Sequence, residues 1–81
     1  MRKYYLYALF DPNLKIPKYI GITNNPDRRY LEHLEDTNNT KKTRWIQSLK
    51  QGNKVPIMKV VKDTNDVHKV IEWEKLYIAK L

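Results

Sequence analysis

This chain of 81 residues contains no cysteine, so no disulfide bond can stabilise its fold. The lack of cysteine fits a reducing compartment. Two apolar segments are also missing: the run of about 18 residues that a membrane-spanning helix needs, and the core of a secretory signal peptide. We therefore expect a cytoplasmic protein that has no membrane as a partner.

Repeats, linkers and low-complexity segments are missing as well. A chain of this length has room for one hydrophobic core and not for two. Its hydrophobic content of 41% is enough to form that core, with a narrow margin of stability. The sequence therefore predicts a single domain over residues 1–81.

Acidic residues are absent from residues 37–62, and the acids of the chain lie before and after that stretch. The stretch holds as many cations as the net charge of +7: Lys41, Lys42, Arg44, Lys50, Lys54, Lys59 and Lys62. Charge of one sign is typical of a surface that binds a polyanion such as nucleic acid. The same charge also fits a soluble domain that binds nothing, so charge alone leaves both interpretations open.

Hydrophobic periodicity predicts six elements in the order strand, strand, helix, helix, strand and helix. They cover residues 3–10, 18–22, 26–36, 41–51, 54–61 and 66–81. The loop after the first strand contains Asp11-Pro12-Asn13, which favours a hairpin. Hairpin connections imply an antiparallel sheet, so we predict an α+β fold with three antiparallel strands flanked by three helices.

The first two strands divide their side chains between two faces of the sheet. The apolar face comprises Leu6, Ala8, Phe10, Ile20 and Ile22. The opposite face comprises Tyr5, Tyr7, Tyr19 and Gly21. Because glycine has no Cβ, a ligand or another backbone can approach closely there. A tyrosine pair followed by a basic helix indicates a place to hold a phosphodiester, although tyrosine also simply favours strands.

The first helix has Asn25 as its predicted N-cap and Pro26 as its first residue. Its apolar stripe comprises Tyr30, Leu31 and Leu34. Arg29 and His33 are four residues apart and share a different face. His33 therefore fits a partly exposed helix histidine as well as a functional group.

The last helix has an acid within its apolar stripe of Val67, Val70, Ile71, Tyr77, Ile78 and Leu81. Glu74 lies in the middle of that stripe, where a carboxylate is costly to bury unless it is paired, protonated or bound to a cation. A buried salt bridge, for example to Arg29, satisfies this requirement. A site for Mg²⁺, which takes one or two carboxylates and keeps several waters, satisfies it equally.

Four segments in this order resemble the GIY-YIG nuclease superfamily. Tyr5-Leu6-Tyr7 stands where that family has Gly-Ile-Tyr, and Tyr19-Ile20-Gly21 matches its second motif fully. Arg29 follows at the expected distance, and Glu74-Lys75-Leu76-Tyr77-Ile78 is similar to the family's metal-binding glutamate helix. The segment from Arg44 to Leu49 is similar to a homing-endonuclease-like subgroup in phage and mobile-element proteins.

The resemblance implies a compact domain that cleaves a DNA phosphodiester bond with one divalent metal ion. It makes Glu74 the ligand of Mg²⁺ or Mn²⁺, and Arg29 the group that binds the phosphate and stabilises charge in the transition state. Tyr7 and Tyr19 are expected to position the attacking water and the phosphate, and one of them is a candidate general base. His33, one turn after Arg29, is a candidate proton relay.

The resemblance also suggests which cations contact the DNA backbone. These are Arg28, which competes with Arg29 for the phosphate role, and Lys41, Lys42 and Arg44. Either arginine also fits a solvated charge paired to Glu32 or Asp36. Trp45 is expected in the core.

The alternative is a non-catalytic nucleic-acid-binding module on the same fold. It rests on the basic segment and on residues 38–42, which lack the histidine or tyrosine that related members often carry. The family often has an asparagine after the glutamate helix, and Leu81 precedes that position, so a trimmed, short or degenerate form is also open. A small interaction domain in which Glu74 pairs with an arginine is a third interpretation. We expect a monomer or weak dimer that lacks an appended DNA-specificity domain.

Overall fold

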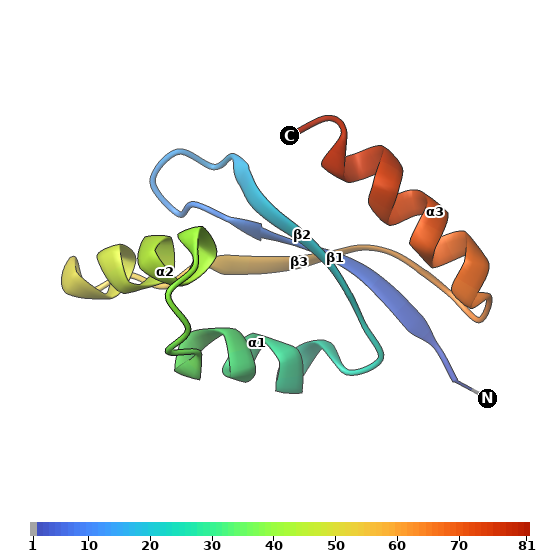
Figure 1. Cartoon of the computed structure of the whole chain (residues 1–81), viewed down its shortest axis with the longest axis horizontal. Coiled ribbons are helices and arrows are strands. Elements are labelled where there is room, and N and C mark those ends of the chain that lie inside the picture. The colour runs from blue at the N-terminus through green and yellow to red at the C-terminus, as the bar shows by residue number, and fades with distance from the viewer. Residues whose placement is uncertain (1) are drawn as a thin grey trace.

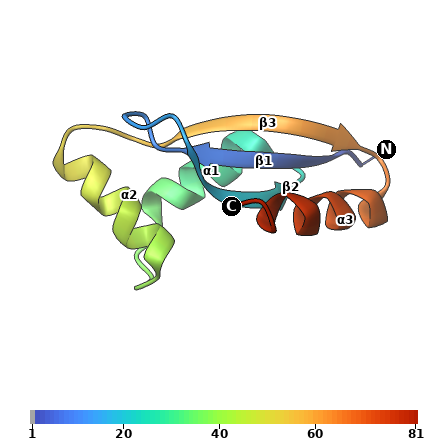
Figure 2. The same ribbon diagram turned by 90° about the horizontal axis from the view of Figure 1, so that it is seen from above.

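The computed structural model describes residues 2–81 and contains three strands and three helices (Figure 1). They are β1 Tyr4–Phe10, β2 Pro17–Thr23, α1 Pro26–Glu35, α2 Lys41–Gln51, β3 Ile57–Thr64 and α3 Val67–Ile78. The strands form one antiparallel sheet in the order β2-β1-β3, so the predicted α+β fold is confirmed. Figure 2 shows β1 between its two partners.

Local signals set most of the element boundaries. The side chain of Asn25 accepts a hydrogen bond from the backbone N–H of Arg28, and Thr40 and Asp66 cap α2 and α3 in the same way. The third strand differs from its predicted span, because it begins after Pro56, which has no backbone donor, and continues to Thr64. The last helix ends at Ile78 and not at Leu81.

One face of the sheet packs against α3 (Figure 1). Its buried core consists of Leu6, Ala8, Ile20 and Val70. Trp73 and Tyr77 of α3 pack around this core, together with half-buried side chains of β1 and β2. The alternation of β1 therefore places its even-numbered residues on the apolar core face, as predicted, and this face packs against α3.

The other face of the sheet packs against α1 and α2. Tyr7, Leu9 and Ile46 are buried at its centre. Around them lie the partly buried side chains of Tyr19, Tyr30, Leu34, Trp45 and Met58. Burial against both layers fixes β1, the central strand, and it positions Tyr7 directly beneath α1.

The packed faces of two helices differ from their predicted stripes. In α1, Leu31 is 56% exposed and His33 takes its place in the interior. Of the stripe predicted for the last helix, the exposed members are Val67, Ile71, Ile78 and Leu81. The half-buried Trp73 instead packs on the sheet. Within residues 2–81, no helix is both long and apolar enough to cross a membrane.

Candidate active site

Tyr7 is completely buried, and its ring lies over Gly21 on the neighbouring strand. The two residues are directly paired across the β1–β2 ladder. A Cβ on Gly21 would lie 2.4 Å from the Tyr7 hydroxyl oxygen, closer than any real contact. The open space predicted at Gly21 for a ligand is therefore filled by the Tyr7 side chain. The glycine of the second motif is needed so that the tyrosine of the first can lie flat on the sheet.

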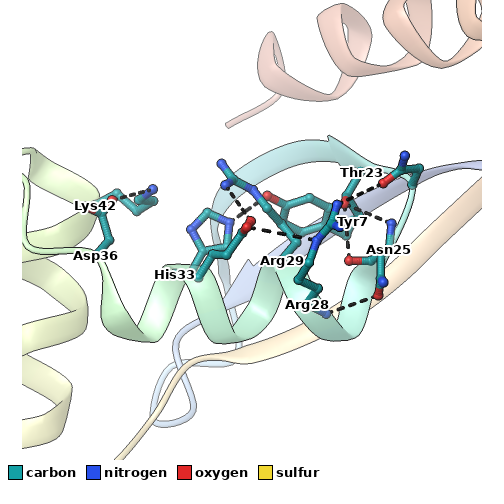
Figure 3. Close-up of polar contacts among 10 residues, drawn as sticks. Tyr7, Thr23, Asn25, Arg28, Arg29, His33, Asp36 and Lys42 are labelled. Atoms are coloured by element: carbon teal, nitrogen blue, oxygen red, sulfur yellow. Dashed lines mark hydrogen bonds and ion pairs between the residues drawn. The ribbon is translucent and has the colours of Figure 1, made fainter.

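The Tyr7 hydroxyl forms a hydrogen bond of 2.6 Å with Nε2 of His33 (Figure 3). His33 is only 1% exposed, so the alternative of a partly exposed helix histidine is wrong. Burial raises the pKa of Tyr7 to about 12, although the nearby Arg29 acts in the opposite direction. Burial, assisted by Lys42 and Arg29, lowers the pKa of His33 to about 4. Both side chains are therefore uncharged at neutral pH.

Arg29 connects this buried pair to solvent. Its side chain is 38% exposed and forms an ion pair of 3.2 Å with Glu32. A hydrogen bond to Tyr7 is the main cause that raises the pKa of Arg29 further above its usual value. A guanidinium group has only donors, so the effect of Arg29 on the Tyr7 oxygen favours the arrangement in which the Tyr7 hydroxyl donates to His33 Nε2.

The second ring nitrogen of His33 has no hydrogen-bond partner. Nδ1 is buried, and no atom of residues 2–81 pairs with it. A buried polar group without a partner costs about 1–3 kcal/mol, so natural cores seldom contain one without a reason. Two buried titratable rings with shifted pKa values beside an open pocket make the Tyr7–His33 pair a candidate functional group.

Tyr19 forms the outer part of the same aromatic group. Its ring centroid lies 6.2 Å from that of Tyr7 and 5.2 Å from that of His33. Tyr19 is only partly buried, and the ammonium group of Lys42 lies 5.2 Å from its ring centre. The structure therefore brings together Tyr7, Tyr19, Arg29 and His33.

Lys42 belongs to this group more closely than the sequence suggested. It forms a 3.4 Å ion pair with Asp36, and the two side chains are only 17% and 19% exposed. The backbone N–H of Asn38 and then Lys42 lower the pKa of Asp36. The other three cations assigned to the DNA backbone, Arg28, Lys41 and Arg44, are exposed. Arg28 pairs loosely with Glu32 at 4.0 Å.

An open pocket of about 530 Å³ lies beside the buried pair. Arg29, His33 and Lys42 are among its lining residues. Three carboxylates also line it, those of Glu32, Glu35 and Asp36. The pocket thus combines a cation, Arg29, with an uncharged imidazole, His33. Hydrolysis of a phosphate ester uses a cation at the phosphate and a group that takes part in proton transfer.

Glu74 lies on α3, whose Trp73 and Tyr77 pack on the other face of the sheet. It is half-buried, and it makes no hydrogen bond or ion pair with another residue of the described part, 2–81. The predicted alternative of a Glu74–Arg29 bridge is therefore wrong, because Arg29 pairs with Glu32.

The donors present fit magnesium better than zinc. Residues 2–81 contain no group of three or more His, Cys, Asp or Glu side chains able to hold a metal. A zinc site requires three or four such ligands, whereas Mg²⁺ is often held by one or two carboxylates and several waters. Glu74, half-buried and without a partner, has the character of such a carboxylate.

Two features of the site were missed by sequence reasoning. One is the Asp36–Lys42 pair, which joins the end of α1 to α2 (Figure 3). The other is the close fit between Tyr7 and Gly21. The first had no signal in the sequence, because the pair forms only when the loop between the helices folds back. The second had one, since a glycine inside a strand often marks a close approach.

Comparison with known families gives one match. The model of the GIY-YIG catalytic domain matches residues 3–81, nearly the whole chain. Neither the curated proteins nor the solved structures gave a significant match.

Proposed function

This chain belongs to the GIY-YIG catalytic-domain family, and on that premise we propose that it is a divalent-metal-dependent endonuclease that hydrolyses DNA phosphodiester bonds. Domains of this family have a nuclease-type fold. The observation that carries the proposal is the buried Tyr7–His33 hydrogen bond with Arg29 at its edge. Burying these polar groups lowers the stability of the fold, so stability alone does not explain them. They also adjoin an open pocket.

Arg29 has the role of binding the scissile phosphate. Its guanidinium is held by Glu32 on one side and by Tyr7 on the other, so it is oriented before substrate arrives. A fixed cation stabilises the negative charge that develops on the phosphate oxygens in the transition state. Tyr7 has no exposed surface, so direct contact with the substrate falls to Arg29 and the partly exposed Tyr19.

Tyr7 and His33 have the role of orienting Arg29, and the proton relay expected of His33 stays a prediction from the sequence. His33 is uncharged at neutral pH because of its low pKa, so its Nε2 can accept the hydrogen bond of the Tyr7 hydroxyl. Tyr7, with a pKa near 12, does not lose that proton to bulk solvent by itself. The pair therefore keeps its place beside Arg29 only while the 2.6 Å hydrogen bond is intact.

Glu74 is the residue that would hold the metal ion, Mg²⁺ or Mn²⁺. When bound, such an ion offsets charge on the phosphate and on the leaving oxygen. The carboxylate is available because it makes no contact with a cation within residues 2–81. Glu72, on the same helix, is exposed, so Glu74 is the acid that we assign to the metal.

The proposal also covers the subtype of the nuclease, the kind of DNA break and the oligomeric state. The similarity of residues 44–49 to phage and mobile-element proteins supports a homing-endonuclease-like subtype. One active site cuts one strand, so a double-strand break needs a second copy of the domain or two successive events. A monomer or weak dimer in the cytoplasm stays the prediction from sequence.

Nicking of supercoiled plasmid DNA tests the proposal. The wild type is expected to nick in Mg²⁺ or Mn²⁺, and Glu74→Gln is expected to lose about 10²-fold or more of that rate because the metal ligand is gone. Glu72→Gln is the matched control and should nick like the wild type. Salt-sensitive binding without cleavage in any metal would instead support the non-catalytic module.

A further inference from the structure

A second open pocket adjoins the candidate active site, and it has the opposite charge balance. The pocket beside Arg29 is lined by three carboxylates against two cations, Arg29 and Lys42. The neighbouring pocket, of about 410 Å³, has no carboxylate in its lining. Its lining residues are Lys18, Tyr19, Lys41, Lys42 and Trp45. The candidate active-site pocket therefore has no excess of positive charge to attract a polyanion, whereas its neighbour has one.

Lys42 belongs to both pockets and forms the wall between them. Its ammonium group is held by Asp36 on one side and by the Tyr19 ring on the other. A cation held in this way is not free to follow a phosphate. Lys18 and Lys41 are both exposed and make no ion pair with a described residue, so they are the cations available to a ligand.

The second pocket also has a fixed aromatic side. The indole N–H of Trp45 donates to Oδ2 of Asp11 at 3.3 Å, which fixes the ring between the hairpin loop and α2. Trp45 is only partly buried, so part of the indole faces the pocket. Two lysines without an ion pair to a described residue, beside an ordered aromatic surface, can contact the phosphates and sugars of a DNA strand.

We infer that the Lys18–Lys41–Trp45 pocket is a separate subsite for the substrate strand, which holds a phosphate next to the one bound by Arg29. This inference rests on the proposed nuclease function and deepens it. Affinity for DNA and chemistry on DNA are then divided between two adjacent pockets. Lys42 acts as a positioning residue at their boundary, in place of the direct DNA contact predicted from sequence.

The test compares charge removal at two pairs of lysines. The double variant Lys18→Gln/Lys41→Gln removes the free cations of the subsite and keeps most of each side chain. The matched control is Lys59→Gln/Lys62→Gln, which removes the same charge from β3, at the opposite edge of the sheet from β2. The dissociation constant of a short labelled DNA duplex is measured with metal chelated, over a series of salt concentrations.

The subsite predicts that its double variant binds roughly tenfold more weakly, and that the slope of log K against log salt falls by about 1 for each lysine. The control pair should change both quantities much less. Equal effects of the two pairs would overturn the inference, because they would show a diffuse charge effect. Thermal unfolding of each variant verifies that the fold is kept.

A second measurement separates this inference from the nuclease proposal. If the wild type cleaves DNA, the subsite variant should raise KM and leave the rate at saturating DNA within about twofold, whereas Arg29→Ala should lower that rate. A loss in the saturated rate alone, with unchanged KM, would overturn the subsite. If the wild type does not cleave at all, the nuclease proposal fails, and the binding comparison still decides whether the subsite exists.

Discussion

The two faces of the sheet are built from the same three strands, yet they bury different chemistry. On the α3 side the buried core is entirely aliphatic, formed by Leu6, Ala8, Ile20 and Val70. On the side of α1 and α2, the interior also contains a tyrosine hydroxyl and an imidazole joined by a 2.6 Å hydrogen bond. An aliphatic core would satisfy α1 equally well at lower cost. The side of α1 and α2, called here the polar face, is the one that adjoins the candidate active-site pocket.

The largest effect on the nicking rate should come from Arg29, which joins the polar face to solvent. Arg29→Ala is expected to lower the nicking rate at saturating DNA by about 10²- to 10³-fold, because an oriented charge donor at the phosphate is lost. Arg28→Ala is the matched control on the same helix, since Arg28 is exposed and does not contact Tyr7. Equal losses in both variants would show that the effect is general attraction of DNA.

Between pH 6.5 and 4, the pH dependence of stability should come mainly from His33 on the polar face. The pKa of His33 is about 4 in the fold and 6.5 when unfolded, so the unfolded chain binds the proton more readily. Stability should therefore fall as the pH drops from about 6.5 to 4, by about 3 kcal/mol in total.

Urea unfolding of the wild type and of His33→Leu, measured across this range, provides the test. The slope should be absent from the variant, because leucine fills the interior and does not titrate. Asp11 and Asp36 have lowered pKa values, so their effect falls at still lower pH. A wild-type stability that is flat between pH 6.5 and 4 would contradict a buried neutral His33.

Filling the space at Gly21 should disturb only the polar face. The Cβ of Gly21→Ala would meet the Tyr7 ring, which is fully buried and has no room to move away. We expect a loss of about 1–3 kcal/mol in the free energy of unfolding. Nicking should fall as well, since the Tyr7–His33 hydrogen bond depends on the position of the ring. Gly52→Ala, where a Cβ makes only an ordinary contact, is the control.

The smallest effect concerns the charge next to His33. Lys42→Gln should raise the pKa of His33 in an NMR titration, because the cation that disfavours the imidazolium is removed. Lys41→Gln, on the exposed side of the same turn, should leave this pKa nearly unchanged. A pKa of His33 that is the same in both variants would show that Lys42 does not act on the buried pair.

Local signals in the sequence were enough for the strands, the helices and their order. Asn25-Pro26 marks the start of α1, and the Tyr19-Ile20-Gly21 motif marks the strand before it. Such signals are read from neighbouring residues, and they hold regardless of what packs above them. The α+β fold could be predicted on this basis, whereas the grouping of Tyr7, Tyr19, Arg29 and His33 was predicted from the resemblance to the GIY-YIG family.

The burial of each helical side chain could not be predicted in the same way. His33 replaces Leu31 in the interior because the hydroxyl of Tyr7, 26 residues away, gives its Nε2 a partner. In α3, the helix meets the sheet along the line of Val70, Trp73 and Tyr77, so apolar residues on either side of that line remain exposed. Both outcomes depend on long-range packing, which the helical period alone does not determine.

The central proposal is that Arg29, on the polar face, and Glu74, on α3 at the other face of the sheet, act in the same cleavage reaction. The most direct measurement is the nicking rate of four proteins: the wild type, Arg29→Ala, Glu74→Gln and the double variant. Groups that act as a unit are strongly non-additive, so the double variant should be no slower than the slower single variant. Losses that multiply in the double variant, or a Glu74→Gln protein as fast as the wild type, would contradict the proposal.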